Sequence, residues 1–273
     1  MKLGQARITL NVDKTVQGPG QIGLALQRGR CGVFGALPNL AVQSETSARR
    51  SGEPAIPDMP NEDKSSALLF LDDDDEPPEE GPDASAVSFT VQYKPYQLYP
   101  DAPKEGQPKQ EWFKKSRYGD TQLKMKTYEA IMTAYGNSAG IKYKFGGTIA
   151  NTMDAHRVIQ HFQEEKGPET ADKMINSLYA QYFENEKHPS ADETLLKAAT
   201  DAGVPEAEAK AYIADHDEGL MDLKNSMREQ AGNGVDSVPY IIFEGKRRDI
   251  TLVGARDVEE YEKAIASIVK ESK

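Results

Sequence analysis

The most reactive side chain in this sequence is its single cysteine, Cys31. Arg28 and Arg30 lie close to it in the chain, and nearby positive charge favours the thiolate, the nucleophilic form of cysteine. No helical pattern begins after Cys31, and no second cysteine is present to resolve a mixed disulfide. Cys31 is therefore a candidate catalytic residue, although its surroundings favour the alternative of a disordered or incidentally buried thiol.

The histidines are not spaced as metal ligands. His156 and His161 lie five residues apart, which places them on different faces of a helix. His188 and His216 lie near expected helix ends, where a solvated or capping imidazole is the ordinary arrangement. The sequence also contains no phosphate-binding glycine loop and no Gly-x-Ser-x-Gly motif. We therefore expect no metal site.

The composition excludes several classes of protein. The chain has 273 residues, with 33 Lys and Arg against 44 Asp and Glu, and thus a formal net charge of -11. This negative field repels phosphate backbones and anionic lipid surfaces, so we expect neither a nucleic-acid partner nor a membrane partner. No window approaches the roughly 18 apolar residues of a membrane span, and no signal-peptide pattern follows Met1. Because one cysteine suits a reducing compartment, the sequence predicts a cytoplasmic protein.

Residues 1–86 differ in composition from the rest of the chain. They are rich in Gly, Pro, Ser and charge, and they include the acidic run DDDDEPPEE at residues 72–80. Segments of this kind bury too little apolar area to offset the entropy of chain ordering. We expect a largely disordered, acidic region, interrupted by two apolar islands at residues 8–12 and 67–71 that could each pair as a strand.

From residue 87 onward the periodicity predicts regular structure. Apolar residues alternate over 87–93, as in a strand with one buried face. Apolar spacings of three and four then predict an all-helical block, with helices near 121–139, after Asn151 and Thr152, near 169–184 and 191–202, from Pro205, and near 220–230. The residues expected on buried helix faces are Tyr128, Ile131, Met132, Tyr135 and Ala139 in the first helix, Ala155, Val158, Ile159 and Phe162 in the second, and Val258, Tyr261, Ile265, Ile268 and Val269 in the last helix of the chain. A loop at 232–239 precedes two hairpin strands, 240–243 and 249–253, and a last helix capped by Asp257.

Four stretches resemble the DsbA-like thioredoxin family, in particular its FrnE-like branch. They are YKPYQL at 93–98 with PDAP at 100–103, FGGTIANT at 145–152 leading to AHR at 155–157, LYAQYF at 178–183, and GVDSVP at 234–239 followed by VGA at 253–255. The resemblance implies an α/β, thioredoxin-like fold with an inserted all-helical domain. Residues 87–120 and 233–273 would form the thioredoxin-like domain, and residues 121–232 the helical insertion.

The first strand and first helix of that family are degenerate or missing here. Members with thiol chemistry carry Cys-x-x-Cys at the junction of these two elements, because a helix N-terminus lowers the thiol pKa. This sequence has no such pair. Residues 67–71 could substitute for the strand, but residues 72–80, with two prolines, cannot form the helix.

The resemblance also implies site residues. Pro239 would be a cis-proline, and the backbone of the preceding Val238 would bind an extended thiol substrate such as glutathione. The alternative is an ordinary trans proline that opens an edge strand. Asn151, Thr152 and His156 would lie beside the cleft, with capping at the protein surface as their alternative role.

Two function hypotheses follow from the resemblance. The first is a relative of the thiol-disulfide oxidoreductases and glutathione-dependent isomerases that acts on a small molecule or thiol without a two-cysteine redox cycle, as in the tailoring of an aromatic secondary metabolite. The second is a catalytically inactive, thioredoxin-like binding or scaffold protein. The sequence decides neither whether the protein is an enzyme nor its oligomeric state, and it indicates no cofactor beyond glutathione.

Overall fold

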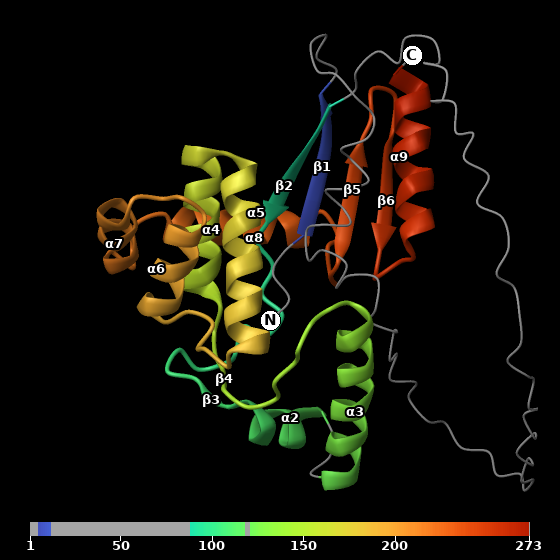
Figure 1. The fold of residues 1–273 in the computed structure, drawn as a ribbon. Helices are drawn as coiled ribbons and strands as arrows, with labels where there is room; N and C mark the ends of the chain where they lie inside the picture. Colours follow the sequence, from blue (N-terminus) through green and yellow to red (C-terminus); the bar gives the residue numbers. More distant parts are fainter. Residues whose placement is uncertain (1–4, 12–87, 118–120, 273) are drawn as a thin grey trace, which may run out of the picture. The chain divides into compact units, whose positions relative to one another are not determined.

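A four-stranded mixed sheet forms one part of the fold. The computed structural model describes residues 5–11, 88–117 and 121–272 (Figure 1). The sheet contains β1 (Gln5–Asn11), β2 (Ser88–Lys94), β5 (Tyr240–Glu244) and β6 (Asp249–Val253), in the order β2-β1-β5-β6. β1 pairs antiparallel with β2 and parallel with β5, whereas β5 and β6 form an antiparallel hairpin.

β1 comes from the first of the two apolar islands. The island at residues 8–12 overlaps β1, so a strand is described within the region that the sequence predicts to be largely disordered. The second island at 67–71, the acidic run at 72–80 and Cys31 lie outside the described residues.

Between β2 and β5 the regular structure that is described is mainly helical. The elements are the short strand pair β3 (Gln107–Pro108) and β4 (Thr148–Ile149), the helices α2 (Lys109–Arg117), α3 (Gln122–Ser138), α4 (Met153–Lys166), α5 (Pro168–Tyr179), α6 (Asp192–Asp201), α7 (Glu206–Ala214) and α8 (Leu220–Gly232), and the π-helical turn η2 (Ala180–Glu184). A final helix, α9 (Val258–Ser272), follows β6. The predicted strand, helical block, hairpin and last helix are therefore confirmed in that order.

The structure differs from the sequence prediction in three places. Helix α2 was not predicted, although Pro108 at its start and Glu111 in its first turn are signals of a helix beginning. Residues 180–184, expected as ordinary α-helix, form a π-helical turn. In α3 the expected stripe holds only in part: Met132 is buried and Tyr128 and Tyr135 are half-buried, but Ile131 is 40% exposed and Ala139 is exposed.

The larger hydrophobic core joins α4, α5, α6 and α7 to the end of β2. The stripe predicted for α4 is confirmed, because its four members are at most 2% exposed: Ala155, Val158, Ile159 and Phe162. A spacing of three and four residues places these side chains on one face of the helix, toward α5. This core therefore holds the first turn of α4, which carries the predicted site residues, in a fixed position.

The end of β2 is bound to the helices by side-chain amides. Gln163 accepts a hydrogen bond from the Tyr93 N–H (2.8 Å) and donates one to the Tyr93 carbonyl (3.0 Å), as a neighbouring strand would. Gln160 donates to the same carbonyl at 2.9 Å, and the Tyr93 hydroxyl donates to Asp172 at 2.5 Å. These bonds fix the start of the loop that follows β2.

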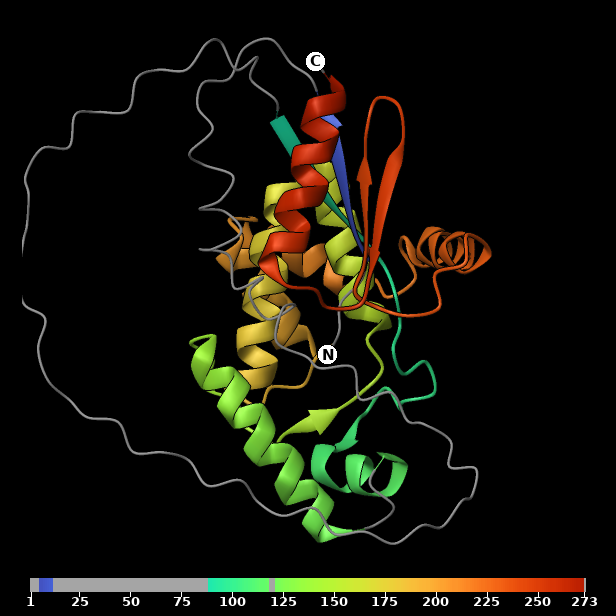
Figure 2. The same ribbon diagram turned by 90° about the vertical axis from the view of Figure 1, so that its right-hand side faces the viewer.

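A second, smaller core lies between α9 and the β5–β6 hairpin, and Figure 2 shows α9 running beside these strands. Ile241 and Phe243 of β5 pack against Ala264 and Ile268 of α9. Val258, expected on the buried face of this helix, is 61% exposed because it is the first helical residue and lies beyond the packed turns. Among the described residues, no helix combines the length and the apolar character needed to cross a membrane.

Candidate functional site

The loop after β2 joins two regions that the sequence singles out. The Tyr96 hydroxyl donates to the carbonyl of Asp236, in the loop before Pro239, at 2.7 Å. The next residue, Gln97, donates to the Asn151 side chain at 2.6 Å. One short segment therefore contacts both the proline loop and the start of α4.

The Val238–Pro239 peptide bond is cis, as the resemblance implied. Both residues are buried, and the Pro239 carbonyl accepts a hydrogen bond from the Gly254 N–H at 2.9 Å. The binding of a thiol substrate at Val238 and Pro239 stays a prediction.

Asn151 connects the loop to the first turn of α4. Its side-chain oxygen accepts from Gln97 and from the Met153 N–H (2.9 Å), and its side-chain nitrogen donates to the Pro100 carbonyl (2.9 Å). Its backbone N–H donates to the Pro103 carbonyl at 3.1 Å. Asn151 therefore positions the loop, and its polar groups are already engaged within the protein.

His156 lies one turn further along α4 and is 2% exposed. Burial lowers the pKa of its imidazole from 6.5 to about 4, and a hydrogen bond with the Tyr96 backbone opposes this shift only in part. Its Nε2 atom is buried and has no hydrogen-bond partner among the described residues. His156 is therefore neutral at neutral pH, and its hydrogen bond with the Tyr96 backbone holds the loop after β2 against α4.

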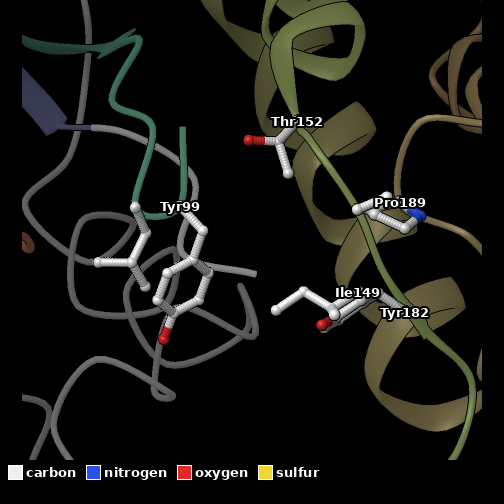
Figure 3. A pocket seen from close by; sticks show the side chains of 7 residues that line it. Tyr99, Ile149, Thr152, Tyr182 and Pro189 are labelled. Atoms are coloured by element: carbon white, nitrogen blue, oxygen red, sulfur yellow. The ribbon is translucent and has the colours of Figure 1, made fainter. Parts of the chain in front are cut away.

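A small cavity lies between this loop and the helices. Its walls are Leu98 and Tyr99 from the loop, Ile149, Ala150 and Thr152 from the approach to α4, and Tyr182 and Pro189. Figure 3 shows Tyr99 on one side and Ile149, Thr152 and Pro189 on the other. The cavity volume of about 20 Å³ holds a water molecule but no larger ligand. Binding of a larger ligand here requires part of the wall to move.

Aromatic side chains continue from this cavity over neighbouring elements. Rings in successive contact, with centroids 4.5 to 6.4 Å apart, are Tyr99, Trp112, Phe113, Tyr128, Phe145, Tyr143, Phe183, Tyr182 and Tyr179. All of them except the buried Tyr182 are half-buried. We call this set the aromatic cluster. The aromatic cluster was not predictable from the sequence, because its members come from loops and helices that are far apart in the chain.

Lys109, the first residue of α2, is a buried cation beside the same cluster. It is 7% exposed, and its Nζ lies 4.2 Å from the centroid of the Tyr182 ring. Burial lowers the pKa of Lys109 from 10.5 to about 8, and the attraction of Glu186 opposes this shift only in part. Burial also raises the pKa of Tyr182. The burial of Lys109 was not predictable either, since its neighbours in the sequence are mostly polar.

Lys109→Met is expected to raise the free energy of unfolding by about 1–3 kcal/mol at pH 7, because methionine keeps the apolar stem and removes a poorly solvated charge. The unfolded lysine binds its proton more tightly than the folded one, so the wild type gains stability between about pH 8 and 10.5. The advantage of Lys109→Met should therefore shrink over that range. Urea unfolding at neutral and alkaline pH measures it, with the exposed Lys173→Met as the matched control. A Lys109→Met protein no more stable than the control would contradict the expectation.

Both the sequence and the fold are similar to those of known proteins. The model of the DSBA-like thioredoxin domain family matches residues 81–266. Among solved structures, a probable DsbA oxidoreductase from Streptomyces coelicolor is similar, with a TM-score of 0.55 and 23% identity over 65% of this chain and 74% of that one. A candidate protein disulfide isomerase from Nitrosomonas europaea gives a TM-score of 0.46 and 16% identity over 54% and 76%. No curated protein sequence matches.

Proposed function

Because the chain belongs to the DSBA-like thioredoxin domain family, we propose that it binds a small molecule or thiol between the Pro239 loop and the helices, and that it acts there without a two-cysteine redox cycle. The sequence supports the second part, since it contains one cysteine. We further propose a FrnE-like role in secondary metabolism and a cytoplasmic location, on the resemblance and the cysteine count alone.

The observation that carries the proposal is the path of the loop after β2. Tyr96 is hydrogen-bonded to the Pro239 loop through Asp236, and three residues later Tyr99 forms a wall of the cavity. A ligand that contacts Val238 and Pro239 and extends toward Thr152 would lie along this segment. Glutathione has the thiol and the extended peptide form that suit the first part of the path.

Tyr99 is the part of the wall that we expect to move for a ligand larger than water. It contacts Trp112 with ring centroids 4.5 Å apart, and it is half-buried, so it can rotate against an aromatic surface. The opened space would be lined by aromatic and aliphatic groups with Thr152 as a polar contact. Such a lining favours an apolar or aromatic group over a charged one, because an unpaired charge loses solvation there.

The test is a titration with reduced glutathione followed by backbone amide NMR on the full chain. We expect saturable shifts at Val238, Gly254 and Thr152, unchanged in Cys31→Ser. Thr152→Val keeps the side-chain volume and removes the hydroxyl, so we expect binding about fivefold weaker. Thr200→Val, on the exposed side of α6, is the matched control and should bind as the wild type does.

Two results would overturn the proposal. Loss of binding in Cys31→Ser would make Cys31 a participant and contradict a thiol-independent site. Absence of saturable shifts in every protein would favour the second function, a thioredoxin-like scaffold protein. The observation in favour of that second function is the small volume of the cavity.

A further inference from the structure

A second hollow lies at the other end of β5 from Pro239. It is lined by Arg247 and Arg248 of the β5–β6 turn and by Ser267, Lys270 and Glu271 of α9, and its volume is about 400 Å³. Pro239 precedes the first residue of β5 and the turn follows the last, so the two places are separated by roughly 17 Å of strand. The volume falls within the usual range for sites of small molecules.

The turn is held against α9 by a glycine. A Cβ atom at Gly245 would lie 2.5 Å from the Arg248 carbonyl oxygen and 2.7 Å from Cδ1 of Ile268. A side chain at Gly245 would therefore push the turn away from the helix. With glycine there, the two arginines of the turn and the last turn of α9 border one hollow.

Glu271 orients the side chain of Arg248. The Arg248 Nε atom lies 2.5 Å from Oε1 of Glu271. The Glu271 side chain is 17% exposed, and the Arg248 side chain is 65% exposed. This contact uses Nε and leaves the two terminal nitrogens of the guanidinium for another acceptor. A guanidinium held in this way presents a fixed pair of donors, the geometry that binds a phosphate through two parallel hydrogen bonds.

Two more cations border the hollow, and neither is paired with Glu271, the carboxylate in its lining. The second carboxylate oxygen of Glu271, Oε2, is buried and has no hydrogen-bond partner among the described residues. Arg247 and Lys270 are exposed, and neither forms an ion pair with a residue that the structure describes. Lys270 lies in the last turn of α9, where it also complements the helix dipole, but this role does not account for the two arginines. The Ser267 hydroxyl donates to the Lys263 carbonyl at 2.9 Å, so its proton is not available to a ligand.

We propose that this hollow binds a phosphorylated small molecule, with Arg248 as the bidentate contact and Arg247 and Lys270 as the neutralising charges. A small anion suits the site better than a long polyanion, because the chain as a whole carries a net charge of -11 and would repel an extended phosphate backbone. The site is separate from the proposed thiol site and does not depend on it.

The test uses inorganic pyrophosphate as the probe and the full chain in isothermal titration calorimetry. We expect saturable binding of one pyrophosphate by the wild type. Arg247→Gln and Lys270→Gln should each weaken it by about tenfold, since each removes a charge-assisted contact. Lys263→Gln is the matched control: it removes the same charge from the same helix, but its side chain pairs with Glu259 away from the hollow, and it should leave the affinity unchanged.

Several outcomes would overturn the proposal. Absence of saturable pyrophosphate binding would do so, as would an equal loss in Lys263→Gln, which would indicate a general charge effect. Sulfate that binds as tightly as pyrophosphate would indicate an adventitious anion site. Binding to phosphoinositide-containing vesicles without binding of free pyrophosphate would replace a soluble ligand with a lipid headgroup. Amide shifts caused by pyrophosphate should appear at 245–248 and 270, so this result is distinguishable from glutathione binding near Val238.

Discussion

Replacing Arg157 with alanine is expected to lower the free energy of unfolding by about 3–5 kcal/mol, the range found when one partner of a buried charged contact is removed. Arg157 is 1% exposed, and it lies on α4 one residue after His156. Its guanidinium donates to the carbonyls of Tyr212 (3.2 Å), Ile213 (3.3 Å) and Glu218 (3.1 Å). Alanine would leave the buried carbonyls of Tyr212 and Ile213 without this donor, whereas the Glu218 carbonyl keeps a hydrogen bond from the Tyr212 hydroxyl (3.2 Å).

The aromatic neighbour of Arg157 adds to this loss. The guanidinium carbon lies 4.6 Å from the centroid of the Tyr212 ring, and His161 stacks on Tyr212 with centroids 3.6 Å apart. Gly219, at φ 72°, allows the chain after α7 to pass close to the Tyr212 hydroxyl, since a Cβ there would lie 2.6 Å from it. Arg157 therefore ties α4 to the end of α7 and to the turn before α8.

Urea unfolding of Arg157→Ala at neutral pH measures the effect. Arg228→Ala is the matched control, because Arg228 lies exposed on α8 and, within the part of the chain that the structure describes, its side chain bonds only to the nearby Asn225. The control should change stability by less than about 0.5 kcal/mol. Arg157→Lys should fall between the two, since one ammonium cannot span the three carbonyls. Equal stabilities of Arg157→Ala and Arg228→Ala would show that the carbonyl contacts contribute little.

Most helices were predictable from the sequence because their apolar stripes face a core. In α4 the stripe from Ala155 to Phe162 has the period of a helix, and the structure buries it completely. In α3 the same reasoning selected Ile131, which is exposed, because this helix packs on its neighbours through fewer contacts and its apolar residues are spread over more than one face. Helix α2 has a mean composition too polar for periodicity to reveal it.

The candidate site was predictable only in part. The resemblance located Asn151, Thr152, His156, Val238 and Pro239, and the structure places the first three at the start of α4 and the last two in a loop bonded to Tyr96. The resemblance did not indicate that the His156 side chain is buried, at 2% exposed. Lys109 and the aromatic cluster depend on contacts between α2, α3 and η2, and such distant pairings leave no local pattern in a single sequence.

Acid is expected to destabilise the protein through His156. Its pKa is about 4 in the folded protein and 6.5 in an unperturbed side chain. Between these values the unfolded state binds the proton and the folded state does not, so stability is complete above about pH 6.5 and falls as the pH drops toward 4. A difference of this size corresponds to a loss of about 3 kcal/mol.

His156→Gln isolates this effect from the carboxylates, which also titrate in acid. Glutamine has a similar polar reach toward the Tyr96 backbone but no proton to gain. Urea unfolding from about pH 7 to about pH 4.5 should therefore show a flatter decline for His156→Gln than for the wild type. His216→Gln is the matched control, because the His216 side chain is 52% exposed, and its decline should match that of the wild type. Parallel declines in the wild type and His156→Gln would contradict the assignment of the acid sensitivity to His156.

Protonation of His156 should also disturb the loop that borders the candidate site. His156 is hydrogen-bonded to the backbone of Tyr96, and the loop from Tyr96 to Tyr99 connects the Pro239 loop with the cavity wall. A proton forced onto the enclosed imidazole must be solvated, and none of residues 96–99 of the loop belongs to the buried apolar cluster that packs around α4. Any ligand held along this loop should therefore lose affinity at a pH above that of global unfolding, and His156→Gln should remove that early loss.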